Sequence, residues 1–91
     1  MQNSVRSSSA LLAGTQSITT TAAALTGGGV CIEIIVQSDH ANTADILVGN
    51  STVQSYRLPP GEDVLLPVNS TTLIYVKSKS GTQVVNWLAR K

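Results

Sequence analysis

The sequence predicts an all-β fold, a small antiparallel β-sandwich or barrel of about six to eight short strands with an extended N-terminal arm. The first observation behind this prediction is that segments of alternating apolar and polar residues recur at intervals of about ten residues. The second is that Gly, Pro, Asn or Asp residues stand between these segments, where the chain has to turn. No segment after residue 30 has a helical pattern of apolar residues. With 91 residues, the chain has room for one such domain.

The first part of the chain differs in composition from the rest. Residues 1–16 are rich in Ser, Asn, Gln and Ala and show little periodicity, which is typical of a flexible or partner-ordered arm. We therefore divide the chain into an N-terminal arm at 1–16 and a β-sandwich domain at 17–91. On this division, removal of residues 1–16 is expected to leave a folded sandwich and to weaken the binding of a partner.

Residues 17–25 are predicted to form a strand or an extended segment. Three consecutive threonines stand in this segment and three glycines follow it at 27–29, which favours an extended chain, although the alanines at 22–24 would permit a helix. The glycines indicate a flexible joint. They match no phosphate-binding motif, because no Lys and no helix start follow them.

The clearest strand is expected at 30–37, where Val30, Ile32, Ile34 and Val36 would share one face. Further strands are expected at 45–48, 53–58, 63–68, 72–78 and 82–89.

Prolines predict a turn at one position in this series of strands and a sheet edge or strand end at another. Pro59, Pro60 and Gly61 predict a tight turn, because Pro presets φ and Gly supplies the left-handed position. Pro67 lacks a backbone donor, so the strand at 63–68 is expected to lie at a sheet edge or to end at this residue.

The inventory of reactive side chains argues against an enzyme. His40 is the single histidine, and a triad would need it with Asp39 or Asp45 and a serine, yet it stands in a polar turn where it would be solvated. Glu62 and Asp63 are neighbours on an extended chain, so their carboxylates point to opposite sides and cannot flank one substrate. We therefore predict a non-enzymatic protein without a cofactor.

The same inventory argues against a metal site and a disulfide. Cys31 is the single cysteine, so it has no intrachain partner, and one Cys with one His cannot form a structural zinc site. The oxygen atoms of Asp39, Asn42 and Asp45 lack the spacing of a known calcium loop. Cys31 is expected to be a buried small hydrophobic residue.

Charge and hydropathy argue against two classes of partner. The formal net charge is +1 and the basic residues are scattered, so we expect no binding to nucleic acid. No apolar stretch approaches the ~20 residues that a membrane span requires, and the apolar run at 10–13 is too short for a signal peptide. We expect a soluble protein that is made inside the cell and does not bind a membrane.

The predicted core is thin. Aromatic residues make up 3% of the chain and Phe is absent from it. Small domains of this kind often gain stability from partner subunits when disulfides and metals are excluded. The composition therefore indicates self-association or docking on a larger assembly.

Candidate partner-binding residues come from the arm and from the segment before the Pro-Pro turn. A polar arm with a few apolar side chains can become ordered on a partner. In the second segment, a tyrosine beside an arginine is the best exposed aromatic candidate, and its ring could also stack on a sugar. The predicted partner-binding residues are Val5, Arg6, Leu11, Leu12, Tyr56 and Arg57.

Four motifs follow one another in a characteristic order between residues 30 and 89. They are NTADILVGN at 42–50, LPPGE at 58–62, LIYVKS at 73–78 and VVNWL at 84–88. This order of strands and turns resembles that of small β-sandwich virion proteins of tailed bacteriophages, including capsid decoration (cement) proteins.

The resemblance implies a structural role on the capsid surface. Decoration proteins bind the outer capsid where subunits of the major capsid protein meet, often as trimers, and they stabilise the head against internal DNA pressure. For this chain it implies synthesis in the host cytoplasm, the major capsid protein or another virion protein as partner, and a homo-oligomer, with a trimer favoured over a dimer. The alternatives are a neck or tail component and a carbohydrate-binding adsorption module.

Overall fold

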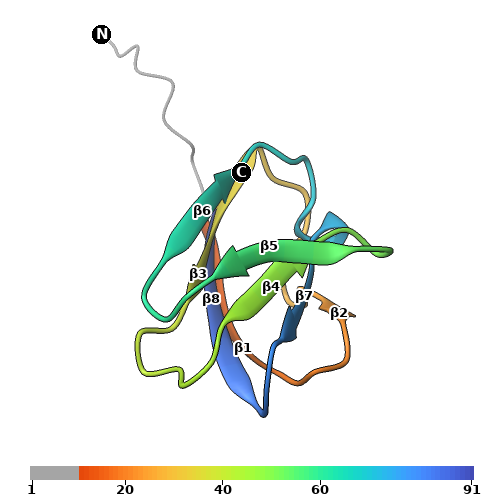
Figure 1. The fold of residues 1–91 in the computed structure, drawn as a ribbon. Helices are drawn as coiled ribbons and strands as arrows, with labels where there is room; N and C mark the ends of the chain where they lie inside the picture. The colour runs from red at the N-terminus through yellow and green to blue at the C-terminus, as the bar shows by residue number, and fades with distance from the viewer. Residues whose placement is uncertain (1–10) are drawn as a thin grey trace, which may run out of the picture.

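The computed structural model describes residues 11–91, and over this range the protein is a sandwich of two antiparallel sheets (Figure 1). Sheet 1 has the strand order β1-β8-β3-β6, and sheet 2 has the order β2-β7-β4-β5. The all-β prediction is thus confirmed. The elements are β1 (Leu11–Ile18), β2 (Ala23–Ala24), β3 (Glu33–Ser38), β4 (Ile46–Gly49), β5 (Gln54–Leu58), β6 (Asp63–Leu66), η1 (Thr71–Leu73, a short 3-10 helix), β7 (Tyr75–Ser78) and β8 (Gln83–Arg90).

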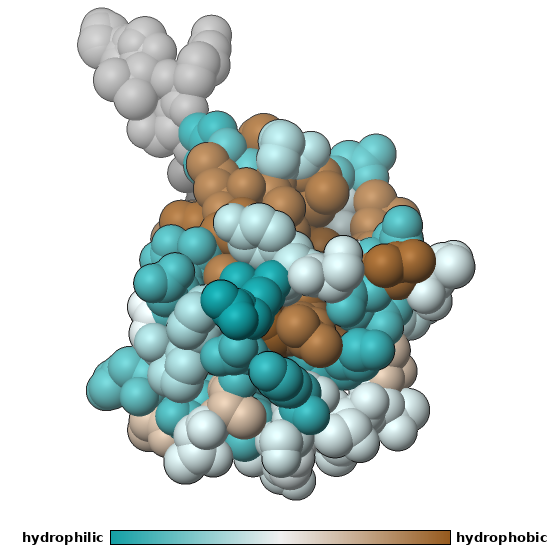
Figure 2. Space-filling view, in the orientation of Figure 1, coloured by the Kyte–Doolittle hydropathy of each residue, from teal (hydrophilic) through white to brown (hydrophobic). Residues whose placement is uncertain are grey.

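The strand order gives the sandwich two different sides. On the closed side, the edge strands are β1 and β2, and the Gln16 side chain of β1 donates to the Ala24 carbonyl of β2 at 3.2 Å. On the open side, the edge strands are β5 and β6, which are joined by the Pro-Pro turn. Apolar surface gathers over β6 and the segment that follows it (Figure 2).

Strand β1 corrects the predicted boundary of the N-terminal arm. Its residues pair with β8 along its whole length, from Leu11 opposite Arg90 to Ile18 opposite Gln83. Residues 11–16 therefore belong to the sandwich, and the boundary predicted at residue 16 is wrong. The rest of the predicted arm, residues 1–10, lies outside the described residues.

A glycine explains why the pattern of β1 is not visible in the sequence. Gly14 pairs with Trp87, and a side chain at Gly14 would overlap the six-membered ring of the indole. The inner face of β1 therefore has no side chain where the tryptophan ring lies. Thr15 and Ser17 are exposed on the outer face, so the strand has the polar composition of an arm.

The start of β3 is also corrected. β3 begins at Glu33, while Val30 is 74% exposed and Ile32 57% exposed, so these two residues do not share the buried face of Ile34 and Val36. Val30 forms an isolated bridge with Ser70, ahead of the regular ladder. The Ile32 N–H already donates to the carbonyl of Arg90, at 2.6 Å, and Arg90 is also the partner of Glu33. Two residues thus stand opposite one residue of β8, which shifts the alternation by one position.

The remaining predictions differ from the structure mainly at the ends of strands. The Pro-Pro turn is present, with Gly61 at φ 88° and the Glu62 N–H donating to the Pro59 carbonyl at 3.0 Å. β6 is an edge strand that ends before Pro67, as its missing donor predicted. The strand expected from residue 72 begins at Tyr75, because η1 precedes it.

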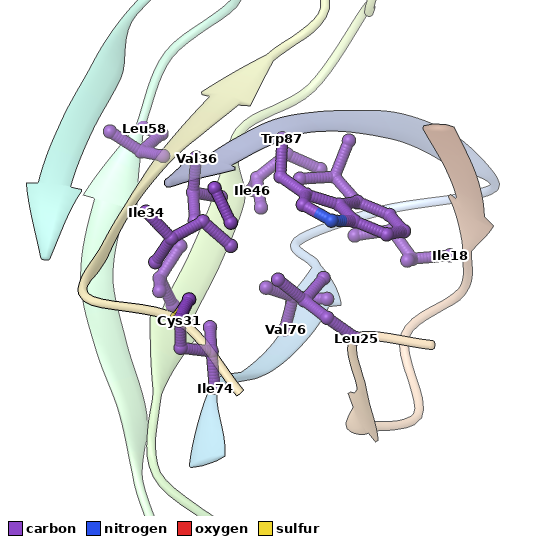
Figure 3. Packing of buried hydrophobic residues seen from close by; sticks show 13 residues of the cluster. Ile18, Leu25, Cys31, Ile34, Val36, Ile46, Leu58, Ile74, Val76 and Trp87 are labelled. Carbon is purple, nitrogen blue, oxygen red and sulfur yellow. The ribbon is translucent and has the colours of Figure 1, made fainter. Parts of the chain in front are cut away.

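The core lies between the two sheets and consists mainly of aliphatic side chains around one indole ring (Figure 3). The Trp87 ring points toward Ile18 of β1, with Leu25 and Val76 beneath it in this view. Cys31 is buried, as predicted, and its thiol donates to the Val68 carbonyl at 3.2 Å. The buried apolar residues are Ile18, Leu25, Cys31, Ile34, Val36, Ile46, Val48, Leu58, Ile74, Val76, Val85, Trp87 and Ala89.

Candidate partner-binding surfaces

The open side of the sandwich carries an apolar groove of about 410 Å³, here called the β5–β6 groove. One wall is formed by β6 and the segment after it, and the other by β4, β5 and η1. Because β5 and β6 are edge strands of different sheets, no further strand covers the gap between them in the described chain. The apolar lining residues are Val48, Tyr56, Val64, Leu66, Val68, Leu73 and Ile74.

Side chains of the groove are partly accessible to solvent. Tyr56 is 58% exposed and Leu73 is 53% exposed, while Val64, Leu66 and Val68 are half-buried and pack against the core. Asn50 is a polar residue of the lining, but its side-chain oxygen already accepts from the backbone N–H groups of Thr52 and Val53 within its own turn. The exposed lining is thus suited to apolar contact more than to polar recognition.

The structure separates Tyr56 from Arg57, which the sequence placed together as one candidate. Neighbouring residues of a strand point to opposite faces, so Tyr56 shares the side of the buried Leu58 and contributes to the groove. Arg57 lies on the other face, where its Nε is 3.5 Å from a carboxylate oxygen of Asp45. The ion pair is exposed on its arginine side, so it contributes little to stability.

The other predicted site residues do not lie at this groove. Leu11 and Leu12 are in β1, at the opposite edge of sheet 1 from β6. Leu11 is 63% exposed, whereas Leu12 packs against the core on the opposite face of the strand. Val5 and Arg6 lie outside the described residues.

A second apolar surface, which was not among the surfaces predicted from the sequence, crosses the outer face of sheet 1. Ala13, Leu88, Ile35 and Leu65 come from four adjacent strands and are paired in register, and we call them the outer row. Leu88, Ile35 and Leu65 are 45%, 39% and 54% exposed. A hollow of about 210 Å³ adjoins the row. The signal was present in the sequence, because Ile35 and Leu88 stand at positions that alternate with the core.

The turn between β3 and β4 holds the polar residues considered for catalysis and metal binding. The Asp39 carboxylate accepts from the Asn86 side chain and from the Ala41 N–H, both at 3.0 Å. These hydrogen bonds, the first being the stronger cause, lower the pKa of Asp39. The Asn42 side chain is bonded to both the N–H and the carbonyl of Val84 at 2.8 Å. These groups thus fix the turn on β8.

Two negative findings apply to residues 11–91. No group of three or more His, Cys, Asp or Glu side chains lies close enough together there to hold a metal ion. The same part of the chain also has no helix with the length and hydropathy needed to cross a membrane.

The comparisons with known proteins give no relative for this chain. No family model matches it, and neither the curated proteins nor the solved structures contain a detectable match.

Proposed function

We propose that this chain is a non-enzymatic structural protein of a tailed-phage virion, and specifically a capsid decoration protein. In this proposal the β5–β6 groove receives an apolar segment of the major capsid protein, and the bound protein stabilises the head. The order of strand and turn motifs supports the virion assignment. The observation that carries the docking role is the groove itself, an apolar gap between two edge strands with Tyr56 and Leu73 exposed at its mouth.

Covering the apolar lining of the groove with a partner stabilises the complex. Apolar surface removed from water contributes roughly 25 cal/mol per Å². Tyr56 adds a large rigid ring, the type of side chain that often dominates the energy of protein interfaces. Edge strands also offer unpaired backbone groups, so an extended segment of the partner could pair with β5 or β6 while its side chains enter the groove.

The experiment is cosedimentation of the purified protein with expanded capsids of the cognate phage, combined with capsid melting. We expect binding and a raised capsid melting temperature, and Leu73→Asp is expected to weaken binding by about ten-fold or more, because it places a charge in the interface. Val53→Asp is the matched control, since Val53 is similarly exposed at 55% but is not part of the groove lining. Wild-type protein that does not bind capsids would refute the proposal.

Two alternative functions have distinct outcomes in related measurements. A copy number of a few per purified particle, in place of hundreds, would favour a neck or tail component. A carbohydrate-binding module is favoured only by the exposed Tyr56 ring, and it predicts binding in a glycan screen that Tyr56→Ala abolishes. Asn50, the polar residue of the groove lining, has its side-chain oxygen engaged in its own turn, which gives this alternative less support.

A further inference from the structure

The outer face of sheet 1 has an ordered arrangement of apolar, charged and amide side chains. The outer row runs across the four strands in its middle. On one side of the row, Arg90 of β8 and Glu33 of β3 form an ion pair, with Nε and Oε2 3.4 Å apart. On the other side, the Asn86 amide donates to the Gln37 side chain at 3.2 Å. A partner for this face needs an apolar band flanked by opposite charges and by amides.

A second copy of the same chain meets this requirement. We infer that sheet 1 packs by its outer face against the same face of a second copy, around a two-fold axis that runs parallel to the strands, between β8 and β3. Such an axis places β8 over β3 of the second copy and β1 over β6. This inference concerns a different surface from the β5–β6 groove and does not depend on the proposed capsid role. It takes a dimer in preference to the trimer that the resemblance favours.

The side chains are complementary under this operation. Arg90 of each copy faces Glu33 of the other, so the two ion pairs combine into a cluster of four alternating charges. In the outer row, Leu88 faces Ile35 of the second copy. The small Ala13 faces the larger Leu65, which fills the space that a short side chain leaves.

A two-fold axis along the outer row, perpendicular to the strands, is less complementary. It would place Leu65 on Leu65 and Ala13 on Ala13, which leaves one end of the row crowded and the other poorly filled. It would also place Arg90 over Asn86 of the second copy, so that the charge faces a neutral amide. The charge pattern therefore selects the axis parallel to the strands.

The size of the face sets the expected affinity. The four strands have eight, eight, six and four residues, so at about 3.4 Å per residue and about 4.8 Å between strands they give about 420 Å² of flat area per copy. Two copies together bury about 850 Å², which is below the range of stable interfaces and typical of weak, transient ones. We therefore expect a weak, reversible dimer with a dissociation constant in the upper micromolar range.

The test uses the full-length protein in sedimentation equilibrium from low micromolar to millimolar concentration. Wild-type protein is expected to pass from monomer to dimer over this range. Glu33→Arg and Arg90→Glu each place like charges opposite one another, so each variant alone is expected to have its dimer dissociation constant raised by about ten-fold or more. An equimolar mixture of the two variants is expected to form a heterodimer, because every contact between the two copies then joins opposite charges.

This mixing experiment separates contacts between copies from contacts within one copy. An Arg90–Glu33 pair that acts only within its own chain would remain broken in both variants, and mixing would restore nothing. Leu88→Lys tests the outer row without altering the ion pair and is expected to give a monomer. The groove variant Leu73→Asp is the control and is expected to dimerise as the wild type does. A wild-type protein that stays monomeric, that forms a trimer, or whose two charge variants fail to associate on mixing would overturn the inference.

Discussion

The two sides of the sandwich are built from edge strands of the same sheets, but they differ in how they are covered. On the closed side, the Trp87 ring lies against Gly14, and the Gln16 side chain joins β1 to β2 and to the Thr26 backbone. On the open side, the turn at 59–62 joins β5 to β6, but no side-chain hydrogen bond between these two strands is found among the described residues, and apolar side chains line a groove. The comparison indicates that stability is concentrated on the closed side, which leaves the open side available for binding.

The strongest test of the closed side is removal of β1. A chain that lacks residues 1–16 loses six of the eight β1 residues and uncovers the Trp87 ring, so we expect it to be unfolded or only marginally stable. A chain that lacks residues 1–10 keeps all of β1 and is expected to melt within a few degrees of the wild type. Circular dichroism melts and the fluorescence of the single tryptophan measure both variants. A stable fold without residues 1–16 would show that β1 is dispensable.

A smaller effect is expected from a side chain placed between β1 and the indole. Gly14→Val would collide with the Trp87 ring and force it out of its position, at an expected cost of about 1–3 kcal/mol in the free energy of unfolding. Ser17→Val is the control on the exposed face of the same strand, with an expected change within about 0.5 kcal/mol. Urea denaturation compares the two, and equal stabilities would contradict the close packing of β1 on Trp87.

The hydrogen bonds of Gln16 on the closed side should contribute less to the free energy of unfolding than the packing of the Trp87 ring does. Gln16→Ala removes the bonds to the Ala24 carbonyl and the Thr26 N–H, at 3.2 and 2.9 Å, and we expect a loss of about 1–2 kcal/mol. Hydrogen exchange at Thr26 should accelerate together with the loss of stability. If exchange at this amide stays unchanged, the bond is not formed in solution.

On the open side, stability should hardly respond to a comparable change. Leu73→Asp is expected to alter the free energy of unfolding by no more than about 0.5 kcal/mol, because the side chain is half exposed before substitution. Its effect on partner binding, by contrast, is the large one described above. A loss of several kcal/mol in the same urea experiment would mean that the groove is part of the core.

The smallest effect concerns the β3–β4 turn, which belongs to neither side. Hydrogen bonds from Asn86 and Ala41 depress the pKa of Asp39 below its usual value of 3.8, so the folded state holds this proton less tightly than the unfolded state. The stabilisation is therefore complete above about pH 4 and is lost as the pH falls through the depressed pKa. Asp39→Asn lacks this carboxylate, so its melting temperature should fall less than that of the wild type between neutral and strongly acidic pH. The same dependence of melting temperature on pH in both proteins would contradict a depressed pKa of Asp39.

The sequence predicted the structure well where apolar and polar residues alternate along a strand, and where a turn contains residues such as Pro and Gly that favour its backbone conformation. The inner positions Val85, Trp87 and Ala89 and the turn at Gly61 follow directly from these local rules. β1 could not be predicted in this way, because its inner face includes Gly14 and Gln16, whose roles depend on partners far along the chain. Local composition alone carries no information about those partners.

The candidate surfaces were predictable to different degrees. The outer row could have been inferred, since Ile35 and Leu88 are large apolar residues at outward positions. The β5–β6 groove could not, because it depends on which strands become the edges of the two sheets. Tyr56 was identified correctly as an exposed ring, but its separation from Arg57 follows from the strand geometry that places neighbours on opposite faces.

The buried thiol of Cys31 provides a natural reporter for the open side. Burial raises its pKa, which lowers the fraction of reactive thiolate, and its Sγ donates to the carbonyl of Val68, a residue that lines the groove. A thiol reagent can reach the buried sulfur only when the chain around it opens, and movement of the segment around Val68, which accepts the thiol hydrogen bond, is one such opening. Because the chain has a single cysteine, its labelling rate reports on these openings, and an occupant that holds the Val68 wall of the groove in place should slow that rate without any engineered probe.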